Sequence, residues 1–195
     1  AMLGKDMLAI TRYRRTPTSG GYGGELVNRQ MIRFEKGTEQ KVFLRAKALV
    51  NASADTSAPI YKAVLNSNVD PIAAAFDIVS IRKDTSLLIE VTSLFSGDAQ
   101  IVGLNSTLKS LYRLGGIQSD RSYIEDIKSF PINIEVKTVK TFAVSPPPNG
   151  PTPPGAPRSV TLPGGVVSGF ATIELNTSLI LLPEVPMKKR LFDPR

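Results

Sequence analysis

Two stretches near the end of the chain, PINIEVKTVKTFAV at residues 131–144 and ATIELNTSLILL at residues 171–182, decide the fold. Apolar side chains occupy alternate positions in both, which is the period of a β-strand with one buried face. Long matched strands are typical of an antiparallel pair. Residues 145–165 between them are rich in proline and glycine and are expected to form a mobile loop outside the core. The apolar faces consist of Ile132, Ile134, Val136, Phe142 and Val144 in the first stretch and Ile173, Leu175, Thr177, Leu179 and Leu181 in the second.

The first fifty residues predict three further strands. Residues 8–11, 31–34 and 42–48 combine β-prone residues with alternation. Residues 36–39, Lys-Gly-Thr-Glu, predict a hairpin turn between the second and third of these strands. The glycine-rich residues 19–24 lack the phosphate-binding pattern G-x-x-x-x-G-K-[ST], so they predict a flexible hairpin loop.

Between these two sets of strands the sequence is mixed. Short helices are predicted near residues 59–66, 104–114 and 120–128, and a short turn is predicted at residues 70–75. The apolar segments at residues 78–81 and 87–91 flank a turn and predict a hairpin. The fold class that follows is α+β, dominated by antiparallel sheet, with a few short helices.

The composition excludes several classes of enzyme. The chain of 195 residues has no His and no Cys, so it has no imidazole for a Ser-His-Asp or Cys-His nucleophile system. Zinc sites use His or Cys ligands almost without exception, so a zinc centre in this chain is not expected. Disulfides and thiol redox chemistry are excluded as well.

The remaining candidates for catalysis have simpler explanations. Ser106 and Lys109 match S-x-x-K, but the S-D-N and K-T-G elements of that family are absent. On the predicted helix, Glu125 and Asp126 are adjacent and point about 100° apart. Asp120 is explained as a helix cap. The sequence therefore predicts no catalytic residue and no metal ligand, and the chain is expected not to be an enzyme.

The charge of the chain is uneven. The net charge is +7, and residues 1–50 hold ten basic and four acidic side chains. These basic side chains are compatible with phosphate contacts, but no nucleic-acid-binding motif accompanies them. We therefore favour solvated outer faces of strands and predict no nucleic-acid partner. The candidate basic surface consists of Arg12, Arg14, Arg15, Arg33, Arg45 and Lys47, with Arg29 nearby in sequence.

Three segments carry a resemblance to a known family: PIYKAVLNSNVDPIAAAFDI (59–78), LGGIQSDRSYIEDIKSFPINIEVKTVKT (114–141) and PMKKRLFDPR (186–195). They resemble the N-terminal, non-catalytic region of large bacterial gluzincin-like zinc-dependent metalloproteases, a region known only as domains of unknown function. The resemblance runs from about Lys5 to Arg195. In that family a separate downstream domain carries H-E-x-x-H, whose His residues bind zinc and whose Glu is the general base.

The resemblance implies a location and a partner for the chain. It implies an exported parent, in the periplasm, at the cell envelope or secreted, with zinc only in the missing catalytic domain. The N-terminus itself has no signal-peptide pattern, and no apolar run reaches the roughly 20 residues of a membrane span. The downstream catalytic domain of the same polypeptide is the expected partner.

We therefore expect one β-rich domain over residues 1–182 and a connector over residues 183–195. Two hypotheses remain open. In the first, the chain is an accessory domain that packs on the protease domain and shapes its substrate cleft. In the second, it is an independent binding module whose basic strands or Pro-rich loop engage a polymer or a protein. The first hypothesis predicts interdomain docking residues in the connector: Lys188, Lys189, Arg190, Leu191 and Phe192.

Overall fold

The two alternating stretches form the long strands β8 (Asn133–Val144) and β9 (Phe170–Leu181) of a computed structural model. They pair antiparallel, as predicted, from Asn133 opposite Ile180 to Ala143 opposite Phe170. Their apolar faces therefore lie on the same side of the sheet. The structure describes residues 2–17, 20–38, 40–47, 57, 59–147 and 159–185.

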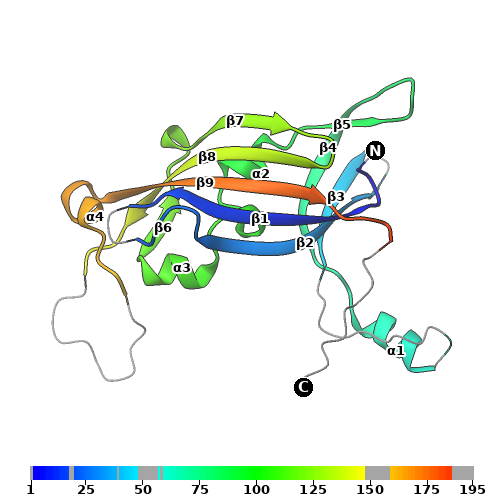
Figure 1. The fold of residues 1–195 in the computed structure, drawn as a ribbon, viewed down its shortest axis with the longest axis horizontal. Coiled ribbons are helices and arrows are strands. Elements are labelled where there is room, and N and C mark those ends of the chain that lie inside the picture. Colours follow the sequence, from blue (N-terminus) through cyan, green and yellow to red (C-terminus); the bar gives the residue numbers. More distant parts are fainter. Residues whose placement is uncertain are drawn as a thin grey trace, which may run out of the picture.

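The described strands form one antiparallel sheet in the order β5-β4-β3-β2-β1-β9-β8-β6, and β7 also pairs with β8 (Figure 1). The fold is thus β-dominated, with a few short helices, as the sequence predicts. The other strands are β1 (Asp6–Arg15), β2 (Leu26–Lys36), β3 (Lys41–Ala46), β4 (Ile72–Ile81), β5 (Leu87–Ile89), β6 (Leu114–Ile117) and β7 (Tyr123–Ser129). The helices are α1 (Pro59–Ser67), α2 (Thr92–Ser96), α3 (Ser106–Leu111) and α4 (Pro163–Ser168), with the 3-10 turns η1 (Gln100–Val102) and η2 (Ser119–Arg121).

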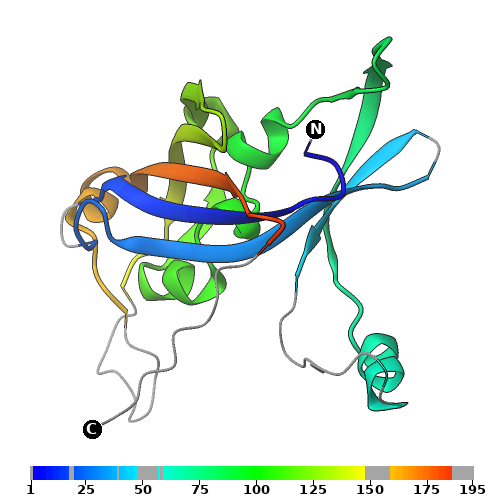
Figure 2. The ribbon, with the colours of Figure 1, turned by 45° about the vertical axis from the view of Figure 1, so that its right-hand side comes forward.

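The core lies between one face of the curled sheet and the segment that contains α2, η1 and α3 (Figure 2). Phe95 of α2 belongs to the larger buried cluster, together with Met7 of β1 and Val136 of β8. Leu104 packs with Phe142 in a second cluster. The chain entering α3 is held by Asn105, whose side-chain oxygen accepts from the Leu108 N–H at 2.8 Å as an N-cap.

The prediction of a helix at residues 120–128 is wrong, since this segment holds η2 and strand β7. The spacing of Ile124 and Ile127 is three residues, which is compatible with a helix. A register shift between Ile124 and Asp126 gives the two isoleucines the same orientation in a strand, because they stand opposite Thr138 and Val136 of β8. Pairing with β8 therefore decides the conformation.

The prediction of a turn at residues 70–75 is also wrong beyond Pro71. Strand β4 begins at Ile72 and pairs with β3, from Ile72 opposite Arg45 to Asp77 opposite Lys41. The continuous run Ile-Ala-Ala-Ala-Phe gives no alternation, and a continuous run does not distinguish a strand from a turn of helix. Pairing with the edge of β3 decides that this run is a strand.

The predicted mobile loop at residues 145–165 lies partly outside the described residues, which leave out 148–158. Its C-terminal part does not match the prediction. Leu162 is only 1% exposed and packs with Tyr112 and Ala171. Helix α4 then begins with Pro163 in its first turn and ends at Gly169, which has a left-handed backbone (φ 74°). Within residues 160–165, Leu162 and the partly buried Val160 therefore contribute to the core.

We expect Leu162→Ala to lower the free energy of unfolding by about 2–4 kcal/mol, because a buried leucine loses both its transfer energy and its packing. Val167→Ala is the matched control in the same segment, since Val167 is 89% exposed. Urea unfolding of both variants measures the difference. Equal and small losses would contradict the packing of Leu162.

The β4–β5 hairpin rises away from the rest of the sheet, and α1 lies apart from the sheet below it (Figure 2). In α1 every side chain that the structure describes is at least partly exposed, including Ile60 at 63%. This end of the molecule thus has much apolar surface in contact with solvent.

Candidate functional site

The predicted basic residues lie on β1, β2 and β3 or directly after β3, and most of them face acidic partners. Arg14 pairs with Glu125, and Arg15 pairs with Glu174 at 3.4 Å. Arg12 donates to the Gly24 carbonyl at 3.4 Å. The surface therefore carries much less uncompensated positive charge than the sequence suggests.

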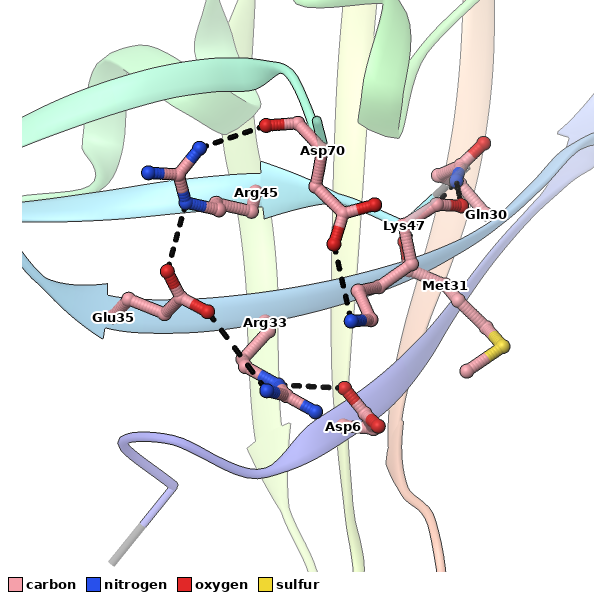
Figure 3. A network of polar contacts seen from close by, with 8 residues as sticks. All are labelled: Asp6, Gln30, Met31, Arg33, Glu35, Arg45, Lys47 and Asp70. Atoms are coloured by element: carbon pink, nitrogen blue, oxygen red, sulfur yellow. Dashed lines mark hydrogen bonds and ion pairs between the residues drawn. The ribbon is translucent and has the colours of Figure 1, made fainter. Parts of the chain in front are cut away.

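The other three predicted cations belong to a network on the outer side of β1, β2 and β3 (Figure 3). The guanidinium of Arg33 lies 2.8 Å from Asp6 and 3.9 Å from Glu35. Glu35 also accepts from Arg45 at 2.7 Å. Asp70 closes the network: its carboxylate lies 3.0 Å from Lys47, and its carbonyl accepts from Arg45 at 2.7 Å.

This network balances three cations with three anions across neighbouring strands. The hydrogen bond from Arg33 is the main cause that holds the pKa of Asp6 below its ordinary value, and burial opposes it. Partly exposed ion pairs contribute little each, about 0–1 kcal/mol. The network therefore balances the charge of this face, and each of its three cations has a carboxylate partner.

Asp6→Asn should lower the free energy of unfolding at pH 7 by up to about 1 kcal/mol. Because the folded pKa of Asp6 is lowered, its stabilisation is present above about pH 4 and is lost as the pH falls through the folded value. The difference between wild type and variant should therefore shrink at acid pH. Urea unfolding at pH 7 and pH 3 measures it, with Asp77→Asn as the exposed control; a constant difference would contradict this assignment.

Lys140 is a buried cation that the sequence analysis overlooked. It is 1% exposed on the inner face of β8, and its ammonium donates to the Gly97 carbonyl at 2.7 Å. Burial lowers its pKa to about 8, while the charge of Asp98 raises it and that of Lys109 lowers it. The signal was present in the sequence, because position 140 shares the alternation of Val136 and Phe142.

The candidates for catalysis are engaged in other contacts. Lys109 of the S-x-x-K pattern pairs with Asp98 at 2.7 Å. Asp120 pairs with Arg121, and Asp126 lies 3.4 Å from Lys137. Within the described ranges no three acidic side chains gather as a metal-binding group.

A mostly apolar groove of about 340 Å³ lies at the raised end of the sheet. Met2 and Leu3 line it together with residues 85–87 and Ile89 of the β4–β5 hairpin. Phe34 of β2 and Val42 of β3 also line it. No motif predicts this groove, because its lining comes from separate parts of the chain.

Strand β4 next to the groove is apolar yet exposed. Eight of the ten residues in IAAAFDIVSI are apolar, but only Phe76 is buried. Val79 and Ile81 are 63% and 66% exposed, and Leu88 on β5 is 45% exposed. Continuous apolar strands are usually covered on both faces. Strand β4 has the apolar composition of such a strand, but most of its side chains are exposed to solvent.

The predicted docking residues Lys188, Lys189, Arg190, Leu191 and Phe192 lie outside the described residues. The start of the connector is described, and there Glu184 pairs with Lys5 at 2.9 Å. None of the helices in the described part of the chain is long and apolar enough to cross a membrane.

Comparison with known proteins gives a family without an assigned activity. No curated protein and no solved structure matches the chain. A family model does match, over residues 24–195, and it is described as a domain of unknown function. Since the match covers most of the chain, including every strand except β1, the protein belongs to the DUF5117 family.

Proposed function

We propose that the chain is a non-catalytic accessory domain of a zinc-dependent metalloprotease and that it packs on the catalytic domain of the same polypeptide. The proposal includes zinc bound only by that catalytic domain and an exported parent, in the periplasm or at the cell envelope. The metalloprotease parent rests on the resemblance of residues 59–78, 114–141 and 186–195.

The observation that carries the docking role is the exposed apolar strand β4. Its side chains Ile72, Val79 and Ile81 are between 49% and 66% exposed. Monomeric proteins rarely leave contiguous apolar surface of this kind uncovered unless a partner binds there. The neighbouring groove adds apolar surface at this end of the sheet.

The charges of the sheet favour this role over polymer binding. Most of the predicted basic residues are paired with carboxylates, as described above. A polyanion would have to compete with those carboxylates for each cation. A partner domain that binds the apolar side chains of β4 does not have to displace any paired group of this chain.

The test is to express this chain and the remainder of its polypeptide separately and to measure their association by calorimetry. Val79→Asp combined with Ile81→Asp should weaken the association at least tenfold, because both side chains are exposed and a buried carboxylate is costly. Ile127→Asp combined with Ile132→Asp is the matched control, at 58% and 63% exposure on β7 and directly before β8. Equal effects of the two pairs, or no association of the wild type, would refute the proposal.

A further inference from the structure

The groove beside β5 has a geometry that selects the form of its occupant. Strand β5 ends the described sheet, with β4 on one side and no described strand on the other. Edge strands present unpaired backbone N–H and C=O groups, which an added strand satisfies better than a helix does. Two residues of this strand, Leu87 and Ile89, line the groove.

The side chains along the groove have the period of a strand. Leu87 and Ile89 are two residues apart and therefore about 7 Å apart on one face, while Leu88 between them is not part of the lining. A strand laid beside β5 presents alternate side chains with the same spacing. Its apolar side chains would contact Leu87, Ile89 and Leu3, which line the groove together.

The charges at the two ends of β5 give the occupant an orientation. Arg82 and Lys83 lie in the turn before β5, and neither forms an ion pair among the described residues. Asp84 in the same turn accepts a hydrogen bond from the Ser86 hydroxyl at 2.6 Å. With two cations and one carboxylate, the turn has a net charge of +1. Glu90 follows Ile89 at the other end. An acidic residue of the occupant is complementary to the turn end of the groove.

We propose that this groove binds an extended segment of the partner polypeptide, which adds to the sheet as a strand along β5 with its apolar side chains in the groove and an acidic residue near Arg82 and Lys83. This inference rests on the proposed docking function and specifies the partner's chemistry. It differs from contact between two preformed globular surfaces, because the recognised unit is a short linear segment.

The test uses a phage-displayed library of random twelve-residue peptides, selected on the immobilised chain. Enriched peptides should alternate apolar and polar residues and carry Asp or Glu toward one end. The best peptide is then synthesised and its affinity measured by fluorescence anisotropy. Leu87→Lys and Leu3→Lys, which each place a charge in the lining of the groove, should each weaken binding at least tenfold.

The matched control is Leu88→Lys, on the same strand but outside the lining, which should change the affinity less than twofold. Leu3 is 41% exposed and precedes β1, so its variant keeps the test valid if Leu87→Lys does not fold. Hydrogen exchange should show new protection of β5 amides in the complex.

Several results would overturn the inference. The selection could enrich no peptide, or it could enrich peptides whose apolar residues have helical spacing. The groove variants could also bind the best peptide as tightly as the wild type does. Sedimentation that shows a dimer broken by Leu87→Lys would instead make a second copy of the chain the occupant. None of these results alters the association test with Val79 and Ile81, which uses folded chains and other side chains, so the docking function and the added strand fail separately.

Discussion

Raising the pH from 7 to 10 should stabilise the fold by roughly 2–3 kcal/mol through Lys140 alone. Burial lowers the pKa of Lys140 to about 8 from its ordinary value of 10.5, so the unfolded chain binds the proton more tightly than the folded chain does. Below pH 8 the fold bears the whole cost of a charged, buried amine. That cost is relieved as the pH rises from 8 toward 10.5, when the folded protein releases the proton first.

Lys140→Met isolates this effect. At pH 7 the variant should be more stable than the wild type by about 1–2 kcal/mol, because removing the buried charge outweighs losing one hydrogen bond to Gly97. By pH 10 the advantage should disappear. Burial raises the pKa of Tyr13 above this range, and other groups that begin to titrate toward pH 10 are shared by both proteins.

The measurement is urea unfolding of both proteins at several pH values between 7 and 10. The quantity to compare is the difference in their free energies of unfolding. Parallel curves would mean that Lys140 keeps an ordinary pKa, and thus that water reaches its ammonium. Asp98 and Lys109 are the neighbouring charges, so Asp98→Asn should lower the pKa of Lys140 further and shift the rise in stability to lower pH.

The second large effect is expected at Phe142. Phe142→Ala should lower the free energy of unfolding by about 3–5 kcal/mol, since a fully buried aromatic ring loses its transfer energy and leaves a cavity. Its ring packs in one cluster with Tyr13, Leu104 and Ile173, which come from β1, the chain before α3 and β9. The loss therefore affects the contact between the sheet and the segment that covers it.

Phe130→Ala is the control for this prediction, because it removes the same atoms from a side chain that is 49% exposed. It should cost less than about 1 kcal/mol. Thermal unfolding followed by circular dichroism compares the two variants. A loss at Phe142 no larger than the loss at Phe130 would contradict the position of the core on this face of the sheet.

Lys140 and β4 share one physical property, which is that each costs stability in the isolated chain. A charged amine is buried at Lys140, and apolar side chains are exposed at Val79 and Ile81. Sequences that contradict local rules in this way often do so at functional positions. The proposed docking role explains the exposed apolar side chains of β4. A partner domain that covered them would remove the cost of exposing them to water.

The sequence by itself determined the class of this fold and part of its chemistry. Alternation in β8 and β9 predicted the central antiparallel pair, because a strand with one buried face repeats every two residues. The leucines around residues 104–114 predicted α3, which is shorter than expected. The absence of His and Cys excluded imidazole and thiol chemistry without any structural information.

The tertiary structure decided everything that depends on a partner across the sheet. Residues 123–129 are a strand because β8 pairs with them, and Ile72 begins a strand because β3 offers an edge. The basic residues of β1, β2 and β3 face carboxylates that are distant in sequence, such as Glu125 opposite Arg14. Periodicity reports which side of a segment is apolar, but pairing, burial and charge compensation are set by residues far away along the chain. That is why the groove beside β5 and the contact of Lys140 with the Gly97 carbonyl became visible only once the strands were assembled.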